Sequence, residues 1–129
     1  WKLASDQGEV LDFQLLEGEV VLINYWATWC PPCVAEMSSL QSLFDAYGEK
    51  VKFVFVTNDD EKRVNEFLLK NNYSFPVYYQ MTQAPEQLRS SSLPTTILID
   101  RTGRIAVQKA GAADWNSQKV RNLLENLLK

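Results

Sequence analysis

The sequence predicts an α/β fold in which helices flank a central mixed β-sheet. Two patterns carry this prediction. An apolar run at 20–26 is followed by a helical pattern and a second apolar run at 51–57, which is a βαβ unit with parallel strands. Two later apolar runs flank the turn at 100–103, which indicates an antiparallel hairpin. A chain of 129 residues is also the length of one domain, so we expect a single domain over 1–129.

The first elements follow from local patterns. Residues 1–3 and 10–15 flank the turn-rich Ser5-Asp6-Gln7-Gly8, which predicts an N-terminal β-hairpin. The run 20–26 is apolar on both alternating faces, as in a central parallel strand. A helix is predicted from Pro31 to about Tyr47, because apolar residues recur there at three- and four-residue spacing before Gly48: Val34, Met37, Leu40, Phe44 and Tyr47.

A second strand and helix follow. The run 51–57 reads as a buried strand, and Asn58-Asp59-Asp60 is typical of the cap of a helix, here from about 61 to 71. Residues 75–79 form a short extended piece, and 84–90 a helical turn or two.

The last elements are a hairpin and a helix. Segments 95–99 and 105–109 flank the turn Asp100-Arg101-Thr102-Gly103. We expect Asp114 to start a final helix, which packs on the sheet through one apolar stripe: Val120, Leu123, Leu124, Leu127 and Leu128.

The chain has two cysteines, Cys30 and Cys33, directly after the strand at 20–26. At the start of a helix such a pair lies on one face and can close a small disulfide ring, and Pro31 and Pro32 are tolerated in a first turn. Because the helix dipole favours a thiolate at that end, Cys30 is predicted to be an accessible nucleophile of low pKa. A disulfide that closes so short a loop adds little to the stability of the fold, which favours a redox-active pair over a structural one. In this mechanism Cys30 attacks the partner disulfide and Cys33 resolves the mixed disulfide that forms.

Composition excludes several other functions. Without histidine, Ser-His, Cys-His and histidine-bound metal mechanisms are excluded, and two cysteines cannot build a four-thiolate zinc site. Val34 stands where haem attachment needs histidine. We therefore expect no cofactor and no metal. A net charge of −3 gives no basic face for nucleic acid, and no apolar run approaches the roughly 20 residues that span a bilayer.

The segment Trp29-Cys30-Pro31-Pro32-Cys33 after an apolar strand, together with Leu93-Pro94-Thr95-Thr96 before a later one, resembles the thioredoxin superfamily. More narrowly, the chain is similar to the TlpA/ResA-like envelope thiol-disulfide oxidoreductases from about residue 9 to its end. The resemblance implies a thioredoxin fold and a cis Pro94 beside the cysteines. It also implies substrate binding by Pro94, the backbone of Leu93 and the side chain of Trp29. Trp26, by contrast, is expected in the core.

The resemblance also suggests partners and a location. It implies exchange with protein thiols and disulfides and an upstream thiol-disulfide electron donor. It also implies a monomeric protein that acts as a reductant in the bacterial periplasm or cell envelope, and a role in cytochrome c biogenesis. The chain begins with Trp1 rather than methionine, so a tether or leader outside this segment is expected. The alternatives are a redox-sensing or interaction domain of a larger chain, and a thiol peroxidase, which Ala27 disfavours because such enzymes carry threonine there.

Two positions depart from the family. Ser38 stands where the branch usually has a helix-kinking proline, and Asn24 stands where thioredoxins bury an aspartate. Asn24 cannot accept the proton of Cys33, so another carboxylate or a water must. We favour Asp60, or its neighbour Asp59, since both follow the next parallel strand; Glu36, one helical turn after Cys33, is the rival. In the alternative interpretation the aspartates only cap a helix and Glu36 faces solvent.

Overall fold

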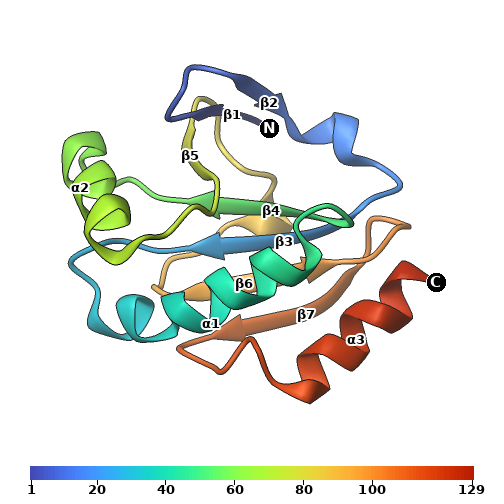
Figure 1. Ribbon diagram of the computed structural model, residues 1–129. Coiled ribbons are helices and arrows are strands. Elements are labelled where there is room, and N and C mark those ends of the chain that lie inside the picture. Colours follow the sequence, from blue (N-terminus) through green and yellow to red (C-terminus); the bar gives the residue numbers. More distant parts are fainter.

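One mixed β-sheet of seven strands runs through the computed structural model, which describes residues 1–129 (Figure 1). The spatial order is β2-β1-β5-β4-β3-β6-β7. The strands are β1 (Lys2–Ser5), β2 (Val10–Asp12), β3 (Val20–Tyr25), β4 (Val51–Val56), β5 (Val77–Gln80), β6 (Thr95–Ile99) and β7 (Ile105–Ala110). The predicted α/β fold with a mixed sheet and an N-terminal hairpin is confirmed.

Strand β3 lies inside the sheet, between β4 and β6, and all six of its residues are buried. It pairs in parallel with β4, with Tyr25 opposite Val56, and antiparallel with β6, with Tyr25 opposite Thr95. The carboxyl ends of β3 and β4 and the start of β6 therefore meet at one edge of the sheet. Ligands of α/β sheets bind at such an edge.

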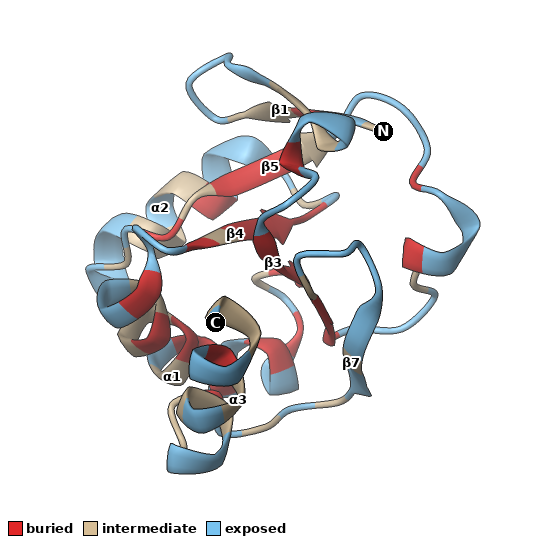
Figure 2. Cartoon of the chain, turned by 90° about the vertical axis from the view of Figure 1, so that its right-hand side faces the viewer, coloured by how far each residue is buried: buried red, intermediate tan, exposed pale blue.

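Three α-helices complete the fold: α1 (Pro31–Tyr47), α2 (Glu61–Asn71) and α3 (Gln118–Leu128). Figure 1 shows α1 and α3 on the same side of the sheet, and buried residues of both belong to one core cluster with β3 and β4. The opposite face carries a second cluster, covered by two short 3₁₀ segments, η1 (Phe13–Leu16) and η2 (Glu86–Leu88), and by the N-terminal residues. In Figure 2 the buried residues gather on the strands and on the inner side of α1.

Helix α1 has the predicted bounds and runs without a break through Ser38. Its apolar face differs from the prediction at one position, because Val34 is 36% exposed whereas Leu43 is fully buried. Val34 therefore lies outside the buried face of α1, and Leu43 belongs to it. None of the helices is both long and apolar enough to cross a bilayer.

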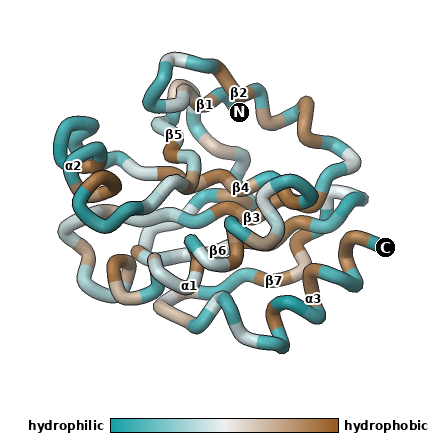
Figure 3. Tube along the Cα trace, in the orientation of Figure 1, coloured by the Kyte–Doolittle hydropathy of each residue, from teal (hydrophilic) through white to brown (hydrophobic).

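Two predicted bounds are wrong by three residues or more. The first strand after the N-terminal turn ends at Asp12, whose carboxylate caps η1 by accepting a bond from the amide of Gln14. The last helix starts at Gln118 rather than Asp114, because Ser117 is its N-cap. Asp114 instead closes a local turn by accepting a bond from the amide of Asn116. Figure 3 shows hydrophobic and hydrophilic residues alternating along α3, in keeping with its one-sided packing.

Candidate active site

Cys30 and Cys33 form a disulfide at the start of α1, with their Cα atoms 5.3 Å apart. Cys30 is the N-cap residue, and its sulfur accepts a bond from the amide of Cys33 at 3.3 Å. In this oxidised state Cys30 is only 5% exposed and Cys33 is fully buried. The predicted placement at the helix N-terminus is confirmed, but the expectation of an accessible Cys30 is wrong in the oxidised state. The two cysteines thus differ only slightly in exposure, and Cys30 is the one that keeps some exposed surface.

The surface beside the disulfide is apolar. Trp29 is 64% exposed although it is the largest type of side chain, whereas Trp26 is 1% exposed and belongs to the core, as expected. The Leu93–Pro94 bond is cis, and the pairing of Thr95 with Tyr25 puts Pro94 at the end of the strand that leads to the cysteines. Leu93 and Trp29 both line a small hollow of about 120 Å³. The structure thus brings Trp29, Leu93 and Pro94 to the sheet edge where the cysteines lie.

Glu36 is a buried carboxylate, so the alternative in which it faces solvent is wrong. It is 2% exposed and accepts three hydrogen bonds: from Asn24 Nδ2 at 3.1 Å, from the amide of Ala113 at 3.1 Å and from Trp115 Nε1 at 2.8 Å. Burial raises the pKa of Glu36, and the bonds from Trp115, Ala113 and Asn24 offset this only in part. Glu36 lies one helical turn after Cys33, on the same face of α1.

Asn24 connects Glu36 to the strand next to β3. It is fully buried, and its Nδ2 donates both to Glu36 and to Thr96 Oγ1, the latter at 3.0 Å. Its Oδ1 has no partner. Sequence reasoning found Asn24 only as a departure from the family and Thr96 only as part of the Leu93–Thr96 motif, and it missed Trp115 altogether. Trp115 gave no usable signal, because its segment was interpreted as the start of the last helix.

The two aspartates after β4 have other partners than the cysteines. Asp60 is the N-cap of α2, where its carboxylate accepts a bond from the amide of Arg63 at 3.0 Å. Asp59 accepts bonds from the amide of Thr28 at 2.9 Å and from the Thr28 hydroxyl, and it pairs with Arg63 at 3.3 Å. No hydrogen bond joins either carboxylate to Cys30 or Cys33. The preference for Asp60 over Glu36 therefore finds no support in the geometry.

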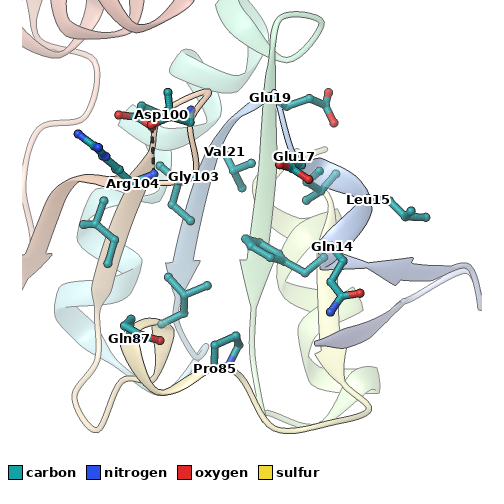
Figure 4. A pocket seen from close by; sticks show the side chains of 17 residues that line it. Gln14, Leu15, Glu17, Glu19, Val21, Pro85, Gln87, Asp100, Gly103 and Arg104 are labelled. Atoms are coloured by element: carbon teal, nitrogen blue, oxygen red, sulfur yellow. Dashed lines mark hydrogen bonds between the residues drawn. The ribbon is translucent and has the colours of Figure 1, made fainter.

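A larger hollow lies elsewhere on the surface. It measures about 960 Å³ and lies at the opposite end of the sheet, between η1, η2 and the turn that joins β6 to β7 (Figure 4). Val21 and Ile99 line it, and these residues pair at the end of β3 that is remote from the cysteines. None of the predicted site residues lines this hollow.

A thioredoxin-type sheet with a cysteine pair at the start of the first helix defines a class, the thiol-disulfide oxidoreductases. The chain belongs to the Redoxin family, whose model matches residues 2–127.

Individual relatives agree with this assignment. The chain is 33% identical to the thiol-disulfide oxidoreductase ResA of Halalkalibacterium halodurans, over 92% of this chain and 68% of that protein. It is 32% identical to the thioredoxin-like protein YneN of Bacillus subtilis, over 81% of this chain and 64% of that one. Its fold matches the crystal structure of StoA from Bacillus subtilis with a TM-score of 0.75, at 23% identity, over 100% of this chain and 96% of that one. The resemblance to the TlpA/ResA-like branch is confirmed.

The chain is shorter than these curated relatives. It spans 68%, 52% and 64% of the first three that it matches. The substrates and partners of these full-length relatives are therefore assigned to this chain only as a proposal.

Proposed function

We propose that this chain reduces disulfide bonds of other proteins by thiol-disulfide exchange, with Cys30 as the attacking thiolate. The observation that carries the proposal is the Cys30–Cys33 disulfide at the amino end of α1, in which Cys30 is 5% exposed and Cys33 is fully buried. A thiolate attacks along the axis of a disulfide, so Cys30, the one residue of the pair that keeps some exposed surface, is the one that a partner can meet.

The reaction balances without a cofactor. In the reduced chain the Cys30 thiolate bonds to one sulfur of the partner disulfide, and the other partner sulfur leaves as a thiolate. Cys33 then loses its proton and attacks Cys30, which restores the disulfide seen here and releases the partner as a dithiol. Two electrons pass to the partner. An upstream thiol-disulfide donor must return them.

Glu36 is the carboxylate best placed to accept the proton of Cys33. It lies one turn after Cys33 on α1 and is buried as Cys33 is, whereas Asp60 is exposed and caps α2. A raised pKa brings a carboxyl group closer to the working pH, which suits a group that exchanges protons. The bonds from Asn24, Ala113 and Trp115 hold it in place.

The apolar surface of Trp29 and Leu93 fits an extended, apolar stretch of a partner protein. Both side chains are exposed, 64% and 36%, around a hollow beside the cysteines, and Leu93 precedes the cis Pro94. The substrates would be protein thiols and disulfides. The chain is similar to the thiol-disulfide oxidoreductase ResA. From the resemblance to TlpA/ResA-like envelope proteins we place the activity in the bacterial envelope, where cytochrome c maturation is one pathway that uses such a reductant. We also propose that the protein acts there as a monomer.

Reduction of insulin tests this function. With dithiothreitol as electron source, the chain should speed the precipitation of insulin B chains, and Cys30→Ser should not. Hydrogen peroxide consumption by the reduced chain should stay at the level of free dithiothreitol. Peroxide turnover without insulin reduction would show a peroxidase, and neither activity would indicate a redox sensor. Titration of the disulfide against dithiothreitol would place the chain between thioredoxin, near about −270 mV, and an oxidant near about −120 mV.

Trp29→Ala should separate protein substrates from small ones. Trp29 is exposed, so its loss should change the free energy of unfolding by less than about 0.5 kcal/mol. Its loss removes apolar contact area for a protein partner, so KM for insulin should rise several-fold. The reaction of the reduced chain with hydroxyethyl disulfide should hardly change. Leu69→Ala is the matched control, since Leu69 is 82% exposed on α2. Equal effects of both substitutions on KM would contradict a binding role for Trp29.

A further inference from the structure

Two loops meet beside the cysteines. One follows β3 and carries Thr28, two residues before Cys30; the other follows β4 and carries Asp59. Because β3 and β4 are parallel neighbours, both loops leave the sheet at the same edge, and Figure 1 shows their arrowheads pointing the same way. The side chain of Asp59 is turned inward to the first loop and is only 2% exposed. Asp60, the next residue, is exposed.

Both oxygens of Asp59 are occupied by hydrogen-bond donors. Oδ2 accepts from the amide of Thr28 at 2.9 Å and from its hydroxyl. Oδ1 accepts from the amide of Asp60 at 2.7 Å and from Arg63 Nη1 at 3.3 Å. Burial alone would raise the pKa of Asp59, but the bonds from Thr28 and Asp60 and the charge of Arg63 outweigh it, so the pKa lies below its ordinary value. The carboxylate is thus ionised and held at both oxygens.

The segment from Trp26 to Cys30 is held at its two ends by packing, because Trp26, Ala27 and Cys30 are buried, and by two backbone hydrogen bonds. The amide of Trp26 donates to Val56 O at 3.0 Å, and the amide of Cys30 donates to Ala27 O at 3.3 Å. Between these two points, Asp59 is the only hydrogen-bond partner of the Thr28 amide and hydroxyl. Trp29 is mostly exposed, so packing does not fix it. Asp59 is therefore the one group that holds Thr28, in the middle of the turn that leads to Cys30, by hydrogen bonds.

We propose that Asp59 is a positioning residue for thiol-disulfide exchange: through Thr28 it holds the turn that sets Trp29 over the small hollow and aims the sulfur of Cys30 at the partner disulfide. The inference rests on the proposed function. Attack on a disulfide needs near-linear alignment of three sulfurs, and Cys30 has little exposed surface through which to reach it. A small shift of the turn then costs reaction rate without changing which atoms react.

The experiment isolates the attack of Cys30. In a reduced Cys33→Ser chain, Cys30 attacks hydroxyethyl disulfide, a mixed disulfide forms, and mercaptoethanol leaves as its thiolate. The second-order rate is measured from pH 4 to 10. It levels off once all Cys30 is ionised, and this plateau reports alignment and access rather than ionisation. Asp59→Ala should lower the plateau about tenfold, and Thr28→Val about threefold, because the latter removes the hydroxyl and keeps the amide.

Asp60→Ala is the matched control. It removes the neighbouring carboxylate and the cap of α2 but no bond to Thr28. Both Asp→Ala chains should unfold at lower urea concentration than the Cys33→Ser parent, yet Asp60→Ala should keep the plateau within twofold. A plateau lowered equally by both substitutions would show a general loss of loop stability and overturn the inference. An unchanged plateau with a shifted midpoint of the rate against pH would also overturn the inference, since Asp59 would then act only through its charge on the ionisation of Cys30. A Cys33→Ser parent that forms no mixed disulfide would refute the proposed function itself.

Discussion

Cys33→Ser is expected to trap partner proteins through Cys30, whereas Cys30→Ser should trap almost none. Without Cys33 the mixed disulfide between Cys30 and its partner has no internal thiol to resolve it, so it accumulates. Without Cys30 the remaining thiol is fully buried in the structure and cannot reach a partner disulfide. The expected ratio of trapped to free chain therefore differs between the two variants by at least about tenfold.

The trapping is measured with oxidised insulin as partner, by alkylating free thiols and separating the products without reductant. Each trapped band should disappear when dithiothreitol is added. Equal trapping by the two variants would contradict the assignment of an attacking Cys30 and a resolving Cys33. The double variant Cys30→Ser/Cys33→Ser is the control for non-covalent association.

Glu36→Ala is expected to lower the free energy of unfolding by at least about 2 kcal/mol, because it leaves the buried donors of Asn24, Ala113 and Trp115 without an acceptor. Glu36→Gln should cost less than about 1 kcal/mol. Its carbonyl can accept from Ala113 and Trp115, and a flipped Asn24 amide can accept from its NH₂ through the oxygen that has no partner here. Urea unfolding measures both values.

The pH dependence of stability gives a second test. Burial raises the pKa of Glu36 from 4.5, so between 4.5 and its folded value the native chain binds the proton that the unfolded chain has released. In that window the contribution of Glu36 to stability falls as pH rises. Glu36→Gln has no such proton. With rising pH the unfolding free energy of Glu36→Gln should therefore increase relative to that of the parent. A difference that is constant over that window would contradict the raised pKa.

The rate of mixed-disulfide resolution tests the catalytic part. If Glu36 accepts the proton of Cys33, Glu36→Gln should slow resolution about tenfold or more at pH 7 and flatten its pH profile. Asp60→Asn is the matched control, since that carboxylate only caps α2. A profile shared by the parent and both variants would mean that Glu36 does not serve Cys33 and that water takes the proton.

Local patterns in the sequence were enough to predict the redox pair and most helices and strands. The bounds of α1 and α2 are the predicted ones, because proline, aspartate and glycine signals act within one or two turns of the chain. The predicted βαβ unit puts Cys30 at the carboxyl end of β3, and the predicted hairpin is the pair β6 and β7. The start of α3 was missed, because Asp114 and Ser117 are both good caps and sequence alone does not rank them.

The partners of the carboxylates were decided by tertiary structure alone. Glu36 finds Ala113 and Trp115 at separations of 77 and 79 residues, and Asp59 finds Thr28 at 31 residues. The same acidic residue can cap a helix, face solvent or be buried, and local sequence does not distinguish these fates. The choice depends on which donors the packed sheet and helices bring within hydrogen-bond distance, since a buried carboxylate is stable only where such donors surround it.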